Sequence, residues 1–237
     1  MSNRAVILVG GKGTRLRPYT VVLPKPLMPI GDYPILEVII RQLSQKGFSH
    51  ITLAVNHQAD IIKSYFGTGK KWGIKIDYSL EEKPLSTMGP LKLIRDLPEH
   101  FLVMNGDVLS DIDYSKFLEA HIKSGKLFTI SASERVNINE YGVLGIDSRN
   151  NLIDFKEKPK HTFLVSMGIY ALNKKVLDYI PDGEAFGFDH LMYRLIGENE
   201  YPLVLTHHGS WLDIGRPDDY MQAIEDFDKD KEKYLND

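Results

Sequence analysis

Two hydrophobic periods alternate along the first hundred residues. Residues 5–9 and 51–55 are continuous runs of β-favouring side chains, which is typical of strands buried on both faces. Between them, residues 35–46 keep the three- and four-residue spacing of an amphipathic helix, and Gly47 ends it. Strands that alternate with helices in this way predict βαβ units and a parallel sheet.

Further elements of both kinds follow. The pattern predicts helices over 59–66 and near 89–95, and strands over 74–78 and 101–104. After residue 107 the expected strands crowd together, at 127–133, 142–146, 152–156 and 165–172. Short helices are expected over 114–124, 174–179 and 189–196, with a polar helix from Pro217 onward. The chain therefore predicts an α/β fold with a mostly parallel central sheet, helices on both faces and a smaller mixed β-region.

Composition narrows the classes of function. Lysine and arginine total 29 against 32 aspartates and glutamates, and this net charge of −3 argues against a nucleic-acid-coating or membrane-surface protein. The chain has no cysteine, which excludes disulfides, thiolate nucleophiles and cysteine-ligated zinc. No apolar run approaches a membrane span, and the N-terminus is too short for a signal peptide, so a cytoplasmic protein is expected. Without repeats or linkers, residues 1–237 are expected to form a single domain.

A glycine-rich segment follows the first predicted strand and contains Gly10, Gly11, Gly13, Thr14 and Arg15. Glycines let backbone N–H groups approach an anion closely, so phosphate is the expected ligand, although a tight turn without a ligand is the alternative. The Walker spacing is absent. Leu16 stands where a dinucleotide fingerprint starting at Gly11 would need glycine, which disfavours a nicotinamide cofactor.

Two further charged positions suit a phosphate site. Lys25 lies between Pro24 and Pro26, whose rings fix the backbone on both sides of it. Asp107 follows the apolar run 101–104, and open parallel sheets bind ligands beyond the carboxyl ends of their strands. Each residue alone could be a solvated lysine or a turn aspartate. Together with the glycine-rich segment and Arg15, they favour a triphosphate ligand.

Segments 10–18 and 24–26 together resemble the signature of the sugar-1-phosphate nucleotidyltransferases, also called NDP-sugar pyrophosphorylases. The resemblance continues, in the family's order, through Asn105-Gly106-Asp107, Tyr141-Gly142, Glu157-Lys158-Pro159, Met167-Gly168-Ile169-Tyr170 and Trp211-Leu212-Asp213-Ile214-Gly215. It spans almost the whole chain and looks closest to the mannose-1-phosphate guanylyltransferase-like members. It implies a Rossmann-like sheet of the nucleotide-diphospho-sugar transferase type.

The resemblance also implies a role for each matching residue. The nucleotide phosphates would be held by Gly10, Gly11, Gly13 and Thr14. Arg15 would steady the departing pyrophosphate, Lys25 would lie near the α-phosphate, and Asp107 and Asp213 would bind Mg²⁺. The sugar phosphate would be bound by Tyr141, Gly142, Glu157, Lys158, Met167 and Gly168. Glu82 and Gly89 would face the base, in a segment where Ser86, Met88 and Pro90 depart from the family pattern.

The expected reaction joins an NTP and a sugar 1-phosphate to give an NDP-sugar and pyrophosphate. GTP with mannose 1-phosphate, or a related hexose, heptose or amino-sugar 1-phosphate, is the first expectation. UTP, dTTP or CTP remain alternatives, as does a catalytically silent regulatory subunit that binds nucleotide sugars. The nucleotide-binding part would span residues 1–110 and the sugar-phosphate-binding part 111–220. No nucleic-acid or membrane partner is expected, and homo-oligomerisation is left open.

Overall fold

The computed structural model describes residues 3–11, 13–56 and 58–235. Its centre is a seven-stranded sheet in the order β12-β8-β11-β6-β1-β4-β5. The strands are β1 (Asn3–Leu8), β4 (Phe48–Val55), β5 (Lys75–Leu80), β6 (His100–Asn105), β8 (Phe128–Ile138), β11 (Lys160–Asn173) and β12 (Leu203–Thr206). Neighbouring strands run parallel except where β11 pairs with β6 and β8. The predicted α/β fold with a mostly parallel sheet is confirmed.

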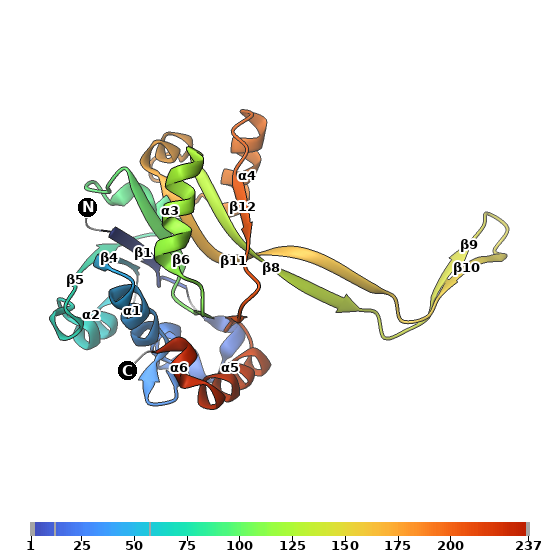
Figure 1. The fold of residues 1–237 in the computed structure, drawn as a ribbon, viewed down its shortest axis with the longest axis horizontal. Coiled ribbons are helices and arrows are strands. Elements are labelled where there is room, and N and C mark those ends of the chain that lie inside the picture. The colour runs from blue at the N-terminus through green and yellow to red at the C-terminus, as the bar shows by residue number, and fades with distance from the viewer. Residues whose placement is uncertain (1–2, 12, 57, 236–237) are drawn as a thin grey trace.

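Helices cover both faces of this sheet (Figure 1). The α-helices are α1 (Ile35–Gln45), α2 (Ala59–Phe66), α3 (Tyr114–Ser124), α4 (Phe188–Gly197), α5 (Pro217–Lys229) and α6 (Lys231–Tyr234). Gly89–Leu93 and Lys174–Tyr179, where helices were predicted, form 3₁₀ turns instead.

Alternate side chains of β1 enter two separate hydrophobic cores. Ala5 and Ile7 join the core that α1, α2, α3 and α5 cover, whereas Val6 joins the core under α4 and the two 3₁₀ turns. Successive side chains of a strand point to opposite faces, so a strand with a core on each side must be apolar throughout. This is why the continuous apolar runs in the sequence identified the central strands.

The C-terminal helix α5 is polar on its outer face only. Tyr220, Ala223 and Phe227 are buried along its inner face, at the spacing of an amphipathic helix, and the Tyr220 hydroxyl donates a hydrogen bond to the Pro29 carbonyl at 2.6 Å. The predicted polar helix is therefore an amphipathic one that closes the first core. Within the described residues, no helix is both long and apolar enough to cross a membrane.

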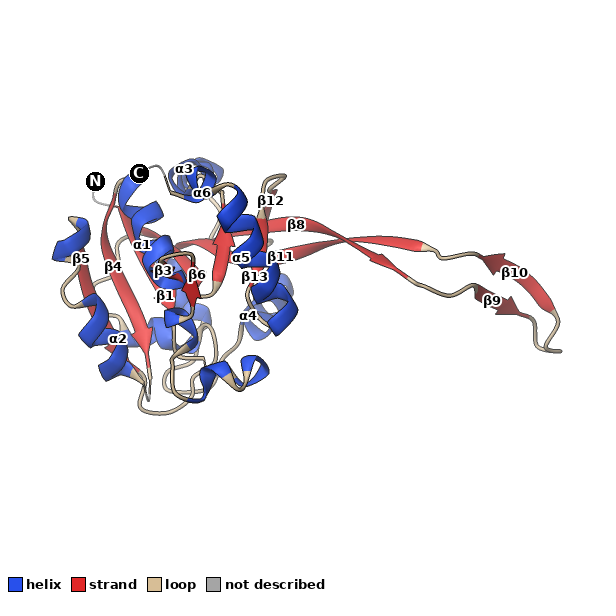
Figure 2. Ribbon diagram, turned by 90° about the horizontal axis from the view of Figure 1, so that it is seen from below, coloured by secondary structure: helices blue, strands red, loops and turns tan. Residues whose placement is uncertain are grey.

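Three two-stranded sheets complete the fold: β2 (Pro29–Ile30) with β3 (Tyr33–Pro34), β7 (Val108–Ser110) with β13 (Trp211–Asp213), and β9 (Val143–Ile146) with β10 (Leu152–Lys156). β8 and β11 continue past the body of the molecule as a paired ribbon, and β9 and β10 lie at its far end (Figures 1 and 2). We call residues 134–164 the arm. The sequence predicted only the buried halves of β8 and β11, because the halves in the arm carry no continuous apolar run.

Candidate active site

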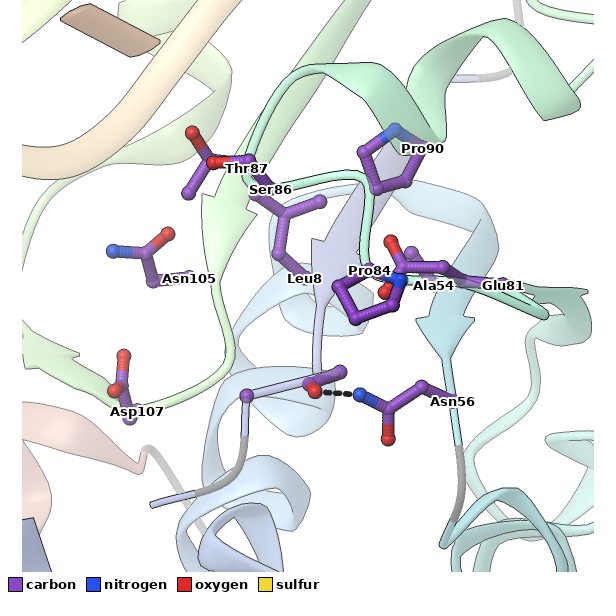
Figure 3. A pocket seen from close by; sticks show the side chains of 12 residues that line it. Leu8, Ala54, Asn56, Glu81, Pro84, Ser86, Thr87, Pro90, Asn105 and Asp107 are labelled. Carbon is purple, nitrogen blue, oxygen red and sulfur yellow. Dashed lines mark hydrogen bonds between the residues drawn. The ribbon is translucent and has the colours of Figure 1, made fainter. Parts of the chain in front are cut away.

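A cavity of about 500 Å³ opens at the carboxyl ends of β1, β4 and β6 (Figure 3). β1 lies between the other two strands, so the chain leaves β1 at a point where the strand order reverses, and such points form ligand crevices in open α/β sheets. The cavity is lined by Leu8, Gly10, Gly11, Ala54, Asn56, Glu81, Pro84, Ser86, Thr87, Pro90, Asn105 and Asp107.

The glycine-rich segment forms one wall of the cavity, and side chains outside the segment hold its backbone by hydrogen bonds. The Asn56 amide donates a hydrogen bond to the Gly10 carbonyl. Gly13 has a left-handed backbone, with φ of 59°, and its carbonyl accepts a hydrogen bond from the Thr20 hydroxyl at 2.7 Å. Leu16 is fully buried in the core below. Gly10 and Gly11 thus face the cavity on a fixed backbone, whereas Lys12 lies outside the described residues.

Lys25 and Asp107 form an ion pair at the edge of the cavity. Lys25 begins a 3₁₀ turn, Lys25–Leu27, in which its flanking prolines are both buried. Its side chain is only 10% exposed, and that of Asp107 is 22% exposed. The ammonium bonds one oxygen of Asp107, while the other oxygen, Oδ1, is buried without a hydrogen-bond partner in the described structure.

Asp213 is brought beside Asp107 by strand pairing. β13 pairs with β7 so that Asp213 lies opposite Val108, and the Ile214 N–H donates to the Asp107 carbonyl at 3.0 Å. Burial raises the pKa of Asp213 above its ordinary value, and the charge of Asp107 raises it further, whereas Lys25 and Arg15 lower it. The structure therefore brings together both predicted carboxylates and both predicted cations.

The two carboxylates suit a small, hard divalent cation. Magnesium takes oxygen ligands, commonly one or two protein carboxylates, with water and phosphate oxygens in the other positions. The unpartnered Oδ1 of Asp107 and the partly buried carboxylate of Asp213 provide such a set. Residues 3–11, 13–56 and 58–235 contain no group of three or more histidine, aspartate or glutamate side chains that could hold a metal without substrate.

Of the two residues expected to face the nucleotide base, neither lines the cavity. Glu82 is exposed and does not line the cavity, whereas Glu81 does, and burial raises the pKa of Glu81. Gly89 is buried beside the cavity wall, where a Cβ would lie 2.9 Å from the Glu184 carbonyl oxygen, so it allows close packing. Asn56 also lines the cavity and was not predicted, although a polar residue just after a buried strand was a usable signal, as it was for Asp107.

The predicted sugar-binding residues fall into two sets. Met167 and Gly168 lie at the root of the arm, where Gly168 has a φ of 75° and a Cβ would come within 2.7 Å of the Asn105 amide. They therefore lie behind a residue that lines the cavity. The second set comprises Tyr141, Gly142, Glu157 and Lys158. These residues lie where the β9–β10 hairpin joins the ribbon of β8 and β11, away from the cavity of their own chain (Figures 1 and 2).

Residues 4–230 match the family model described as nucleotidyl transferase. The chain is 34% identical to the UTP–glucose-1-phosphate uridylyltransferase of Synechocystis sp., over 93% of this chain and 62% of that protein. It is also 34% identical to the mannose-1-phosphate guanyltransferase of Saccharomyces cerevisiae, over 93% of this chain and 63% of the relative. The chain thus spans about three fifths of the length of the curated relatives it matches.

Solved structures share this fold. HddC from Yersinia pseudotuberculosis superposes with a TM-score of 0.74 at 30% identity, over 95% of this chain and 99% of HddC. A putative glucose-1-phosphate thymidylyltransferase from Bacillus anthracis shares the fold, with a TM-score of 0.77 at 22% identity over 94% of each chain. With the family model matching nearly the whole chain, and with carboxylates and cations gathered at the expected edge of the sheet, this protein belongs to the nucleotidyl transferase family.

Proposed function

We propose that this chain transfers a nucleotidyl group from an NTP to a sugar 1-phosphate, giving an NDP-sugar and pyrophosphate. One observation carries the proposal: Arg15, Lys25, Asp107 and Asp213 meet beside a cavity walled by glycine backbone. Fixed cations beside exposed N–H groups suit a polyphosphate, and two carboxylates suit the cation that accompanies it. Membership of the nucleotidyl transferase family supports the same reaction.

The proposed reaction needs little covalent chemistry from the protein. A phosphate oxygen of the sugar 1-phosphate attacks the α-phosphorus of the NTP, and the bond from that phosphorus to the bridging oxygen breaks as pyrophosphate leaves. The nucleophile is already an anion at neutral pH, so no general base is required. Positioning and charge stabilisation therefore account for the rate.

Each site residue has a role that its environment favours. Lys25, stiffened by its prolines and shielded from solvent, is proposed to stabilise the charge at the α-phosphate. Arg15 lies on the exposed side of the site and is proposed to hold the departing pyrophosphate. Asp107 and Asp213 would hold Mg²⁺. When bound, Mg²⁺ neutralises charge on the nucleotide phosphates.

GTP is the nucleotide that we propose first. Glu81 is the carboxylate among the residues that line the cavity on the side of residues 81–90. Guanine has two adjacent N–H groups that can both donate hydrogen bonds to one carboxylate, whereas uracil and thymine have one such group. Two relatives support this choice: the yeast enzyme is named a guanyltransferase, and HddC, at 29% identity, has been crystallised with GMP-PN. The uridylyltransferase relative keeps UTP as the alternative.

The test is a matrix of substrates read out as pyrophosphate release. GTP, UTP, dTTP and CTP would each be paired with the 1-phosphates of mannose, glucose and N-acetylglucosamine, with Mg²⁺ and with EDTA. We expect Mg²⁺-dependent release with GTP, and Glu81→Gln should reduce the preference for GTP over UTP. Turnover with dTTP but none with GTP would refute the guanine preference. Tight binding of nucleotide sugar without any pyrophosphate release would identify a silent subunit.

A further inference from the structure

Beyond its root, the arm has no packing partner among the described residues of its own chain. Burial along β8 and β11 stops where the strands leave the body: Phe128 and Leu172 are buried, whereas residues from Glu134 onward on β8 and back from Leu164 on β11 are exposed. All of β10 and most of β9 are exposed as well. In both views the ribbon leaves the body and its tip touches nothing else (Figures 1 and 2).

The arm exposes many large apolar side chains to solvent. Eleven of the 24 large apolar side chains that are exposed in the described structure lie in its 31 residues, including Leu144 and Phe155, which are cross-strand partners. An isolated two-stranded ribbon is at best marginally stable in water, and a large exposed apolar patch marks an interaction surface. The arm therefore needs a surface to cover it.

The root of the arm is fixed, so the arm cannot fold back onto its own cavity without breaking contacts. The Trp211 indole N–H donates to the Met167 carbonyl at 2.9 Å, and the buried Ser131 hydroxyl donates to the Ile169 carbonyl at 2.8 Å. The Arg135 guanidinium lies 4.7 Å from the centre of the Trp211 ring. Beyond the root, seven consecutive residue pairs from Ser166–Ala132 to Lys160–Ile138 keep the ribbon in register.

The arm also carries chemistry that the cavity of its own chain lacks. A Cβ on Gly142 would lie 3.1 Å from the Glu157 carboxylate, so the predicted sugar-binding residues Tyr141, Gly142, Glu157 and Lys158 gather at one place, at the base of the β9–β10 hairpin. The body supplies the cations and carboxylates for the nucleotide. A single chain thus holds two halves of one site at a distance from each other.

We propose that two copies of this chain exchange arms, so that Tyr141, Glu157 and Lys158 of each copy complete the active site of the other. Exchange of an identical element gives a closed, two-fold symmetric dimer in which each arm is covered by the other copy. The completion of the sugar site rests on the proposed function, whereas the exchange of arms rests on the exposed apolar surface and the fixed root.

The exposed area is large enough for such a dimer. At about half exposure and roughly 150 Å² per side chain, the eleven apolar residues offer on the order of 800 Å² on each arm. Two exchanged arms would then bury on the order of 1,600 Å², the size of a standard stable interface.

The first experiment measures mass, independently of activity. By sedimentation and light scattering, the full chain should have twice the 27.0 kDa of one copy. Replacing residues 134–164 by Asn-Gly, a two-residue hairpin turn between Ser133 and its partner Val165, should give a folded monomer. Leu144→Ser with Phe155→Ser should weaken the dimer without touching the body, whereas the control pair Val22→Ser with Tyr193→Ser, even more exposed but outside the arm, should leave the mass unchanged. A monomeric full chain at micromolar concentration overturns the proposal.

The second experiment asks whether the arm serves the other copy. Asp107→Ala disables the body and Lys158→Ala disables the arm, and dimers containing one of each would be purified through two different tags. With exchanged arms, one site of this mixed dimer is intact, so activity should return to about half of the wild-type value per dimer. If each arm serves its own chain, both sites carry one defect and the mixed dimer stays as inactive as its parents, which overturns the proposal.

A matched control and the mass measurement separate the possible failures. A mixed dimer of Asp107→Ala with Arg15→Ala places both defects in the bodies, so no activity should return. If the wild-type protein transfers no nucleotidyl group but loses its dimer with the arm, the proposed function fails and the exchange of arms stands. If an active protein is monomeric, the exchange fails and the proposed function stands.

Discussion

Replacing Lys25 by methionine should destabilise the protein, because it leaves the Asp107 carboxylate without its partner. The other oxygen of Asp107 is buried without a hydrogen bond, so the ammonium of Lys25 is the group that balances this charge in the free protein. Removing one member of a buried ion pair costs about 3–5 kcal/mol. Because the Asp107 side chain keeps 22% of its surface in solvent, we expect the low end, about 3 kcal/mol.

Urea unfolding at pH 7.5 in EDTA measures this loss without a divalent cation that could replace the ammonium. The double variant Lys25→Met with Asp107→Asn removes both charges at similar volume and should cost less than about 1 kcal/mol. With the cost of Asp107→Asn alone included, the cycle should give a coupling of at least about 2 kcal/mol. Lys126→Met, at an exposed lysine, is the matched control. The reasoning is refuted if Lys25→Met lies within about 0.5 kcal/mol of wild type, or if the effects of the two substitutions simply add.

Three further predictions follow from the same structure. Arg15→Ala should lower turnover by about 100-fold while the exposed position leaves the melting temperature unchanged, and wild-type rates of pyrophosphate release would show that the site is misplaced. Asp213→Asn should raise the melting temperature of the metal-free protein at pH 8, since burial and Asp107 raise the pKa of Asp213 and disfavour its charged form. This gain should shrink as the pH falls and Asp213 takes up a proton, and the variant should lose stabilisation by Mg²⁺; a wild-type response to Mg²⁺ in melts would count against the metal site. Burial, with His100 nearby, lowers the pKa of His121 from 6.5 to about 4. The unfolded chain therefore binds a proton that the folded protein rejects, so on the order of 3 kcal/mol of stability should be lost between about pH 6.5 and pH 4. His121→Gln should flatten that part of the pH profile in urea titrations, and an unchanged profile would contradict it.

The buried part of the fold was predictable because a strand that is buried on both faces has a continuous run of apolar residues in the sequence. β1, β4 and β6 each contain a continuous apolar run, and these runs were predicted, although β4 begins three residues earlier, at Phe48. β7 and β13 were not predicted separately, since each has three residues and too few positions to show a period. Their pairing, which brings Asp213 to Asp107, therefore had to come from the structure.

Placement within irregular segments was less predictable. Glu81 and Glu82 are neighbours in a loop that follows β5, and nothing in the local pattern indicates which of them turns toward the cavity. The arm posed a different difficulty. A ribbon that leaves the body has the same local alternation as one that packs against it, so the sequence predicted the strands β9 and β10 but neither their pairing nor their separation from the cavity.

Trp211 is an intrinsic fluorescence probe of the root of the arm. Its indole holds the Met167 carbonyl at the root of the arm, and it stands two residues before Asp213 on β13. The chain contains one other tryptophan, Trp72, which lies in the 3₁₀ turn Lys70–Trp72 beside Phe66. In a Trp72→Phe background, the emission of Trp211 alone would report displacements of the root, so the proposed binding of sugar phosphate and of Mg²⁺ could be followed in real time without an added dye.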